Sequence, residues 1–221
     1  MANRYVIKFT KTGYAKYTSH LDMLRFFKRA FRKSGISLRY SKGFNPHPKL
    51  SFAQPLSLGY SSSCELLEFE TEIHHDPGEI FSLLLNEMPE GMEIKQVEEM
   101  GAEVKSLASS ADSAEYIVEI PFDMDQNKLK EICGAYIEQD EIIALKRRKK
   151  DKKMVPVDIK NMIRSLEANT THTSIVLKMD LDCGSVSNCS PELVISSFLE
   201  FADIKVPRYK IEVERTKLEF V

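Results

Sequence analysis

Tryptophan is absent from the 221-residue sequence, cysteine is scarce, and there is no long hydrophobic run. No apolar stretch approaches the roughly 18–20 residues that a helix needs to cross a bilayer, and the N-terminus shows no signal peptide. We therefore expect a cytoplasmic protein without membrane contact. The cysteines form no CxxC pair, which predicts reduced structural thiols rather than a zinc site. They are Cys64, Cys133, Cys183 and Cys189.

The short motifs of several enzyme classes are also missing. The sequence contains no Gly-rich phosphate loop, no GxGxxG, HExxH or GxSxG, and no triple-cysteine motif of an iron–sulfur cluster. It therefore predicts no metal and no cofactor. With 43% apolar and 29% charged residues, the chain has the composition of a globular protein with a substantial core, which excludes wholesale disorder.

Charge is strongly segregated along the chain, although the net charge is only −2. Residues 1–60 contain twelve Lys or Arg and a single acid, Asp22, whereas residues 61–113 contain two Lys and thirteen acids. A basic segment of this kind creates a positive potential suited to an anionic partner. The alternative is that the basic and acidic segments neutralise each other within one domain.

Alternation and helical periodicity predict a β-α-β-β-α-β order in the first half of the chain, which is the ferredoxin-like pattern. The first helix would begin at a capping box formed by Ser19 and Asp22 and would end at Gly35. Strands are expected at 5–9, 36–40, 50–52, 67–73 and 94–97, and helices at 20–34 and 77–88.

The second half repeats this order more loosely. Strands are expected at 116–122, 142–145, 175–181 and 209–213, and helices at 129–136 and 190–198. An insertion at 146–170 separates the middle strands, and a short helix is expected at 157–166. Small polar residues at 106–113 predict a linker. We therefore expect an α+β protein with two tandem ferredoxin-like domains and antiparallel sheets: a basic domain at 1–105 with an elaborated hairpin, and a second domain at 114–221.

Two sets of cations in the first sixty residues are candidates for phosphate contacts. Arg25 and Arg29, followed by Arg32, recur at i, i+4 and i+7 and form one stripe opposite the apolar face of the first helix. Lys8 and Arg39 alternate with apolar residues, which predicts a position on the open face of the sheet, a known platform for single-stranded RNA. The two surfaces point in different directions, so one flat site cannot use both. A solvated basic face is the alternative, although like charges at i, i+4 destabilise a helix.

The turn-rich segment 43–48 carries further candidates. Prolines on both sides of His47 present its imidazole with little entropy to lose. His20 and His47 are candidates for an acid–base pair on a phosphodiester, and ordinary surface or turn histidines are the alternative. The remaining candidate RNA contacts are Lys42 and Lys49 for phosphates, Tyr17 and Phe44 for base stacking, and Asn45 for polar contacts.

Two strongly charged stretches remain. Residues 146–153 contain seven bases in eight positions, which predicts a hairpin extension that grips phosphates without sequence preference, or a merely solvated loop. The acidic stretch 61–113 is either a solvated surface or a docking surface for a basic partner.

The runs 17–25 (YTSHLDMLR) and 40–53 (YSKGFNPHPKLSFA) resemble those of an uncharacterised bacterial family of radical-SAM-linked proteins with a conserved domain of unknown function. The resemblance covers most of the chain and is weaker after residue 110. It implies a role near RNA-processing or ribosomal functions, with a radical-SAM protein as partner. It transfers no catalytic residue. The general plan also resembles that of CRISPR repeat-processing endonucleases, in architecture only.

From these observations we expect an RNA-binding accessory protein for tRNA or rRNA processing or modification, working with a radical-SAM enzyme. One alternative is a metal-independent RNA endonuclease that uses His20 and His47. Another is a protein-interaction scaffold that binds a radical-SAM partner through the acidic surface.

Overall fold

The computed structural model describes residues 3–101, 103–148 and 150–221. The chain forms two compact units: unit 1 comprises Met1–Ala111 with Phe220–Val221, and unit 2 comprises Asp112–Glu219. Residues 106–113, the predicted linker, contain a short helix and the beginning of a strand.

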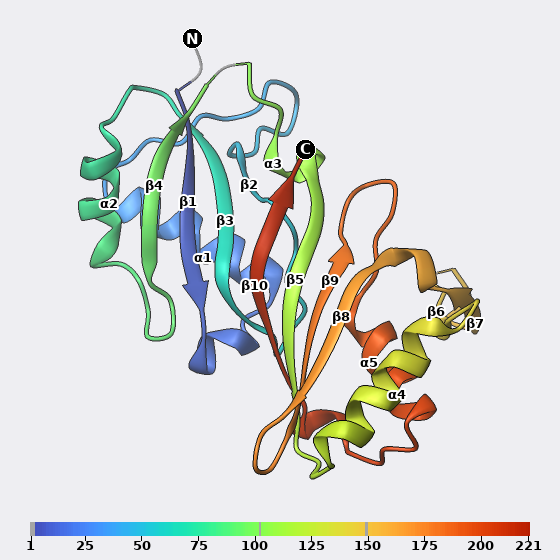
Figure 1. The fold of residues 1–221 in the computed structure, drawn as a ribbon. Coiled ribbons are helices and arrows are strands. Elements are labelled where there is room, and N and C mark those ends of the chain that lie inside the picture. Colours follow the sequence, from blue (N-terminus) through green and yellow to red (C-terminus); the bar gives the residue numbers. More distant parts are fainter. Residues whose placement is uncertain (1–2, 102, 149) are drawn as a thin grey trace. The chain divides into compact units, whose positions relative to one another are not determined.

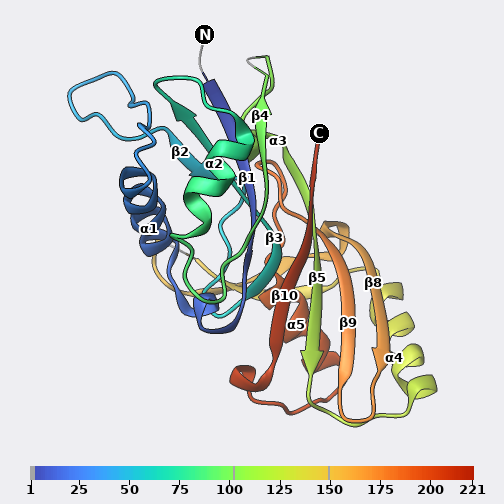
Figure 2. The ribbon, with the colours of Figure 1, turned by 90° about the vertical axis from the view of Figure 1, so that its left-hand side faces the viewer.

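Unit 1 is a sheet of four strands with two helices on one face (Figures 1 and 2). Its strands follow the order β4-β1-β3, β2 pairs with β3, and these pairings are antiparallel. The elements are β1 (Asn3–Lys11), the 3-10 helix η1 (Gly13–Tyr17), α1 (His20–Lys33), β2 (Leu50–Phe52), β3 (Ser61–Thr71), α2 (Pro77–Leu85), β4 (Ile94–Met100) and α3 (Leu107–Ser110).

The core of unit 1 is built mainly from aromatic rings between α1 and the sheet. Tyr5 of β1 stacks on Phe69 of β3, its partner in the register, with 5.4 Å between ring centroids. Phe31 of α1 lies 4.6 Å from Phe69, and Phe27 lies 5.1 Å from Phe9. All five side chains are buried, and aromatic pairs at such distances stabilise a core beyond their burial alone.

The sequence of α1 separates an apolar face from a basic face. Its buried residues are Met23, Phe27, Ala30 and Phe31, at the i, i+4, i+7, i+8 spacing of one helix face. The predicted cap is present, because the Asp22 N–H donates to Ser19 Oγ at 3.2 Å and that hydroxyl donates to the Asp22 carboxylate at 2.7 Å.

The chain reverses direction at Gly35, immediately after α1. Gly35 has a φ of +75°, and the N–H of Ile36 donates to the Phe31 carbonyl at 3.0 Å, which closes the helix in a Schellman arrangement. The predicted strand at 36–40 is reduced to two isolated bridges, Leu38 with Thr71 and Tyr40 with Pro48, because β2 occupies the regular pairing with β3.

Replacing Gly35 by alanine is expected to lower the free energy of unfolding by about 1 kcal/mol, the cost of a left-handed residue that carries a Cβ. A Cβ at this position would meet nothing within 4 Å, so no steric clash adds to this cost. Urea unfolding followed by circular dichroism measures the change. A fully unaltered midpoint would contradict this account of the helix end.

Unit 2 has the same element order with an inserted hairpin, and its helices α4 and α5 lie on one side of the sheet (Figure 1). Its strands follow the order β10-β5-β9-β8. The elements are β5 (Ala111–Ile120), α4 (Gln126–Glu138), β6 (Ile143–Arg147), β7 (Met154–Asp158), η2 (Lys160–Met162), β8 (Ile163–Thr170), β9 (Ile175–Asp182), α5 (Pro191–Phe201), η3 (Arg208–Lys210) and β10 (Glu212–Phe220).

The middle of unit 2 differs in part from the prediction. The strand expected at 142–145 is present as β6, but it pairs with β7 in a separate two-stranded sheet instead of joining the main sheet. The expected helix at 157–166 is instead the end of β7, the single turn η2 and the start of β8. β8 pairs with β9, and Leu166 and Ala168 alternate with polar residues along it, which is a strand pattern.

The predicted α+β class is confirmed. Within the described ranges, no helix is long and apolar enough to cross a membrane.

Candidate functional site

The open face of the unit 1 sheet, away from α1 and α2, is of mixed charge rather than basic. Its outward positions alternate with the buried core positions of the same strands. They include Arg4 and Lys8 on β1, Glu68 and Glu70 on β3, and Glu98 on β4. Lys8 therefore lies on the open face, as the sequence predicts, and no aromatic side chain occupies a described outward position of β1, β3 or β4. The use of this face as an RNA platform stays a prediction.

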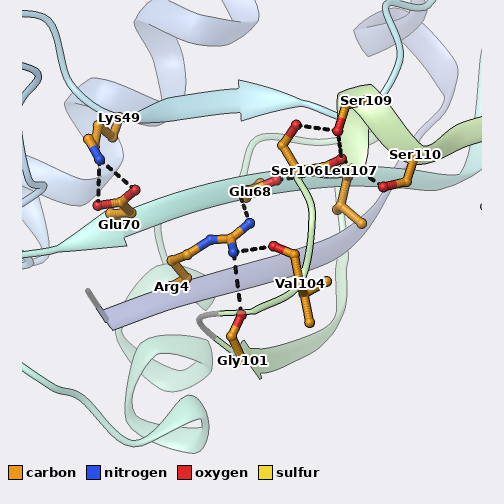
Figure 3. A network of polar contacts seen from close by, with 10 residues as sticks. All are labelled: Arg4, Lys49, Glu68, Glu70, Gly101, Val104, Ser106, Leu107, Ser109 and Ser110. Atoms are coloured by element: carbon orange, nitrogen blue, oxygen red, sulfur yellow. Dashed lines mark hydrogen bonds and ion pairs between the residues drawn. The ribbon is translucent and has the colours of Figure 1, made fainter. Parts of the chain in front are cut away.

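Carboxylates of the acidic stretch neutralise several of the cations on this face (Figure 3). Arg4 donates to Glu68 at 2.7 Å and to the carbonyls of Gly101 and Val104, while Glu68 also accepts from the Leu107 N–H at 2.9 Å. The segment before β5 is therefore tied down over this part of the sheet.

Two of the predicted phosphate contacts share one acid. Lys49 Nζ lies 2.8 Å from the Glu70 carboxylate, and an Arg39 guanidinium nitrogen lies 3.4 Å from it. A phosphate would have to compete with Glu70 for both cations. Arg39 and Lys49 are thus weaker candidates than sequence alone indicates.

A groove runs between α1 and the segment that follows Gly35. It has a volume of about 550 Å³, and we call it the α1 groove. Four cations of α1 line one side, and the single acid in the lining is Glu72. The residues that line it are Arg25, Lys28, Arg29, Phe31, Arg32, Gly35, Ile36, Ser37, Leu38, Tyr40, Pro48 and Glu72.

The cations of the α1 groove are mostly uncompensated. Arg25 pairs with Asp22 at 2.9 Å, and hydrogen bonds from Ser19 and Arg25 lower the pKa of Asp22, so this acid stays ionised at neutral pH. Lys28, Arg29 and Arg32 are exposed and have no ion-pair partner in the part of the chain that the structure describes. Lys33, the remaining cation of α1, pairs with Glu87 and does not line the groove.

The loop that carries the predicted segment 43–48 is closed at its base. The Ser41 N–H donates to the His47 carbonyl at 2.9 Å, and the His47 N–H donates back to Ser41 Oγ at 3.1 Å. The His47 ring also contributes to this closure, because its Nδ1 lies within hydrogen-bond distance of Ser41 Oγ, at 3.0 Å. Lys42, Asn45 and the fully exposed Phe44 extend from this loop, which projects from unit 1 in Figure 2.

His20 lies in different surroundings from His47. Its ring packs edge-on against Phe52 at 5.2 Å between centroids, in a cleft of about 330 Å³ beside β2. No residue that lines this cleft contacts His47 in a described hydrogen bond. His20 and His47 thus share no partner among the described hydrogen bonds, and their use as an acid–base pair stays a prediction. Tyr17, also predicted, is exposed on η1 with Lys16 Nζ 5.3 Å above its ring.

Sequence reasoning missed Tyr40, which it assigned to a strand. The bridge to Pro48 holds Tyr40 at the groove, where 52% of its surface is exposed. Gly35 and Pro48, which limit any strand in this region, are the sequence features that indicate a non-strand position.

Unit 2 carries the second basic surface, the tip of the β6–β7 hairpin. Arg147 and Arg148 are exposed there, and Arg148 pairs with Asp151 at 2.9 Å. Lys149, part of the predicted basic run, lies outside the described residues.

Over the described ranges, no group of three or more His, Cys, Asp or Glu side chains is arranged to hold a metal ion. The four cysteines are buried and unbridged, and burial raises the pKa of Cys133, Cys183 and Cys189, which is unfavourable for thiolate formation.

A family model described as "Uncharacterized protein conserved in bacteria (DUF2344)" matches residues 4–191. The chain belongs to this family. No curated protein matches the sequence. The DUF2344 match includes the whole α1 groove and the loop beyond it.

Among solved structures, a chain from a Cbf5-Nop10-Gar1 complex resembles this DUF2344 protein with a TM-score of 0.52 and 10% identity. The similarity covers 97% of this chain and 48% of the other, so the protein spans about half the length of that relative. An unknown protein from Galdieria sulphuraria has a TM-score of 0.28 at 12% identity, over 100% of this chain and 99% of the other. At such identities the likeness concerns the fold alone.

Proposed function

We propose that this DUF2344 protein binds RNA and that the α1 groove contacts the RNA phosphates. The observation that carries this proposal is a row of three exposed cations along one side of a groove, Lys28, Arg29 and Arg32, which pair with no acid among the described residues. Guanidinium groups match phosphate oxygens bidentately, and an anionic ligand relieves the repulsion between like charges at i, i+4.

We infer an accessory protein of tRNA or rRNA processing or modification in the cytoplasm, with a radical-SAM enzyme as partner, from the sequence resemblance described above. The β-α-β-β-α-β order and the strand order of each unit support two ferredoxin-like domains. Lys8, Lys42, Asn45 and Phe44 are exposed around unit 1 and remain candidate RNA contacts.

A matched pair of lysines on α1 tests the RNA proposal. Lys28→Ala is expected to weaken binding of total cellular RNA about fourfold at 0.15 M salt and to reduce the slope of log affinity against log salt by about 0.7, the value for one phosphate contact on a single strand. Lys33→Ala removes the same charge from the same helix outside the groove and is expected to leave both values unchanged.

Fluorescence anisotropy across a salt series measures both quantities. RNA binding that is independent of salt, or equal losses from the two lysine variants, would reject the groove as the phosphate site. Absence of RNA binding would reject the function itself.

A further inference from the structure

The α1 groove is more than a row of charges, because its floor is apolar. Phe31, Ile36 and Leu38 line it beneath the cations and are buried, with at most 8% of their surface exposed. Tyr40 forms part of the opposite wall and is half exposed. A phosphate backbone alone makes no use of an apolar floor or an aromatic wall, whereas a nucleobase does.

We propose that the α1 groove binds an unpaired nucleotide of single-stranded RNA, with its base stacked on Tyr40 and its flanking phosphates on Lys28, Arg29 and Arg32. This inference rests on the proposed RNA binding and names the form of RNA. The groove volume of about 550 Å³ falls within the usual range for sites that enclose a small ligand group.

The position of Tyr40 is fixed before any ligand arrives. Tyr40 bridges Pro48, and the Lys49 N–H donates to the Arg39 carbonyl at 2.8 Å, so backbone contacts hold the residues on both sides of it. One residue further along, the hydrogen bonds between Ser41 and His47 hold the two arms of the same loop together. Because the backbone that carries the ring is already held, less entropy is lost when a base stacks on Tyr40.

An RNA duplex cannot contact the aromatic and apolar parts of the α1 groove. In an A-form helix the base faces are stacked inside, and proteins reach mainly phosphates and 2′-hydroxyls. Such a ligand would leave Tyr40 and the apolar floor without contacts. Phe44, fully exposed at the tip of the neighbouring loop, offers a second ring for an adjacent unstacked base.

The experiment compares one RNA sequence of about 12 nucleotides as a single strand and as a duplex, using the full chain and fluorescence anisotropy. The single strand is expected to bind at least tenfold more tightly. Tyr40→Ala is expected to lower single-strand affinity about tenfold and to leave duplex affinity unchanged, whereas Tyr40→Phe keeps the ring and the affinity. Tyr14→Ala, which removes an even more exposed tyrosine outside the groove, is the control.

A second measurement identifies the contact directly. Photo-crosslinking with 4-thiouridine in the single strand, followed by mass spectrometry, is expected to mark Tyr40 or Phe44. Equal affinity for single strand and duplex, or a Tyr40→Ala variant that binds the single strand as the wild type does, overturns the inference. If the lysine pair on α1 still behaves as expected in that case, RNA binding stands and only the unpaired nucleotide is rejected. If neither RNA form binds, both proposals fall.

Discussion

Replacing Lys28, Arg29 and Arg32 together by glutamine is expected to weaken RNA binding roughly 30- to 100-fold at 0.15 M salt. Each phosphate contact releases about 0.7 counterions from a single strand, so three lost contacts reduce the salt slope by about 2. No acid of the described residues pairs with these side chains, so their charge is fully available to a ligand.

The same variant is expected to fold at least as well as the wild type. Three like-charge pairs at i, i+4 disappear, each unfavourable by roughly 0.2–0.5 kcal/mol, so the thermal midpoint should stay constant or rise. The pairs are Arg25–Arg29, Lys28–Arg32 and Arg29–Lys33. A loss of binding can then not be attributed to unfolding.

A charge-matched control removes Lys33, Lys95 and Lys105, three cations of unit 1 that do not line the groove. This triple variant is expected to keep nearly all of the RNA affinity. Equal losses in the two triple variants would mean that the overall charge of the protein, rather than the α1 groove, determines binding.

Gly91→Ala is expected to cause the largest loss of stability, about 2–5 kcal/mol in the free energy of unfolding. Gly91 has a φ of +82°, where a Cβ costs roughly 1–2 kcal/mol. A Cβ there would also lie 2.3 Å from the carbonyl oxygen of Thr12 and 3.2 Å from the Cβ of Ala15, an overlap that adds roughly 1–3 kcal/mol.

The close approach at Gly91 is part of a backbone contact. The Thr12 N–H donates to the Gly91 carbonyl at 2.7 Å, so the turn before β4 is held against the start of η1. Relief of the overlap would break this hydrogen bond. Gly35→Ala, with the same sign of φ but open space around the Cβ, isolates the conformational cost from the steric one.

Gly134→Ala provides a control of opposite sign. Gly134 lies inside α4 with nothing within 4 Å of its would-be Cβ, so alanine there is expected to stabilise the protein by about 0.5–1 kcal/mol. Urea unfolding of the Gly35→Ala, Gly91→Ala and Gly134→Ala variants measures the free energy of unfolding of each and ranks them. A Gly91→Ala protein as stable as the wild type would contradict the close contact with Thr12.

Local patterns predicted the elements with strong periodicity and clear ends. α1 begins at Ser19 and stops before Gly35 as expected, because capping and helix termination depend on neighbouring residues. Burial inside the helix is harder to predict, since Leu21 is exposed whereas Met23, two residues later, is buried. Which of several adjacent apolar residues is buried depends on the sheet beneath the helix.

Pairing between distant strands was beyond the reach of local pattern. Residues 142–145 were expected to be a strand and 157–166 a helix, yet β8 pairs with β9 while β6 pairs with β7, because strand partners are chosen among segments far apart in sequence. The functional site, too, was only partly predictable from local pattern. The arginine stripe was visible at i, i+4 and i+7, but the pairing of Arg39 and Lys49 with Glu70 was not.

Local sequence is enough to indicate the segregation of charge, the α+β class, the ends of α1 and the basic face of that helix, because each depends on residues close together in the chain. Which cations remain available depends on the three-dimensional fold. Arg4, Arg39 and Lys49 meet acids from β3, whereas Lys28, Arg29 and Arg32 face a groove that Gly35 and Tyr40 complete. Ion pairing acts over a few ångströms in space and is independent of separation along the chain, so the fold had to be known before the charges could be assigned.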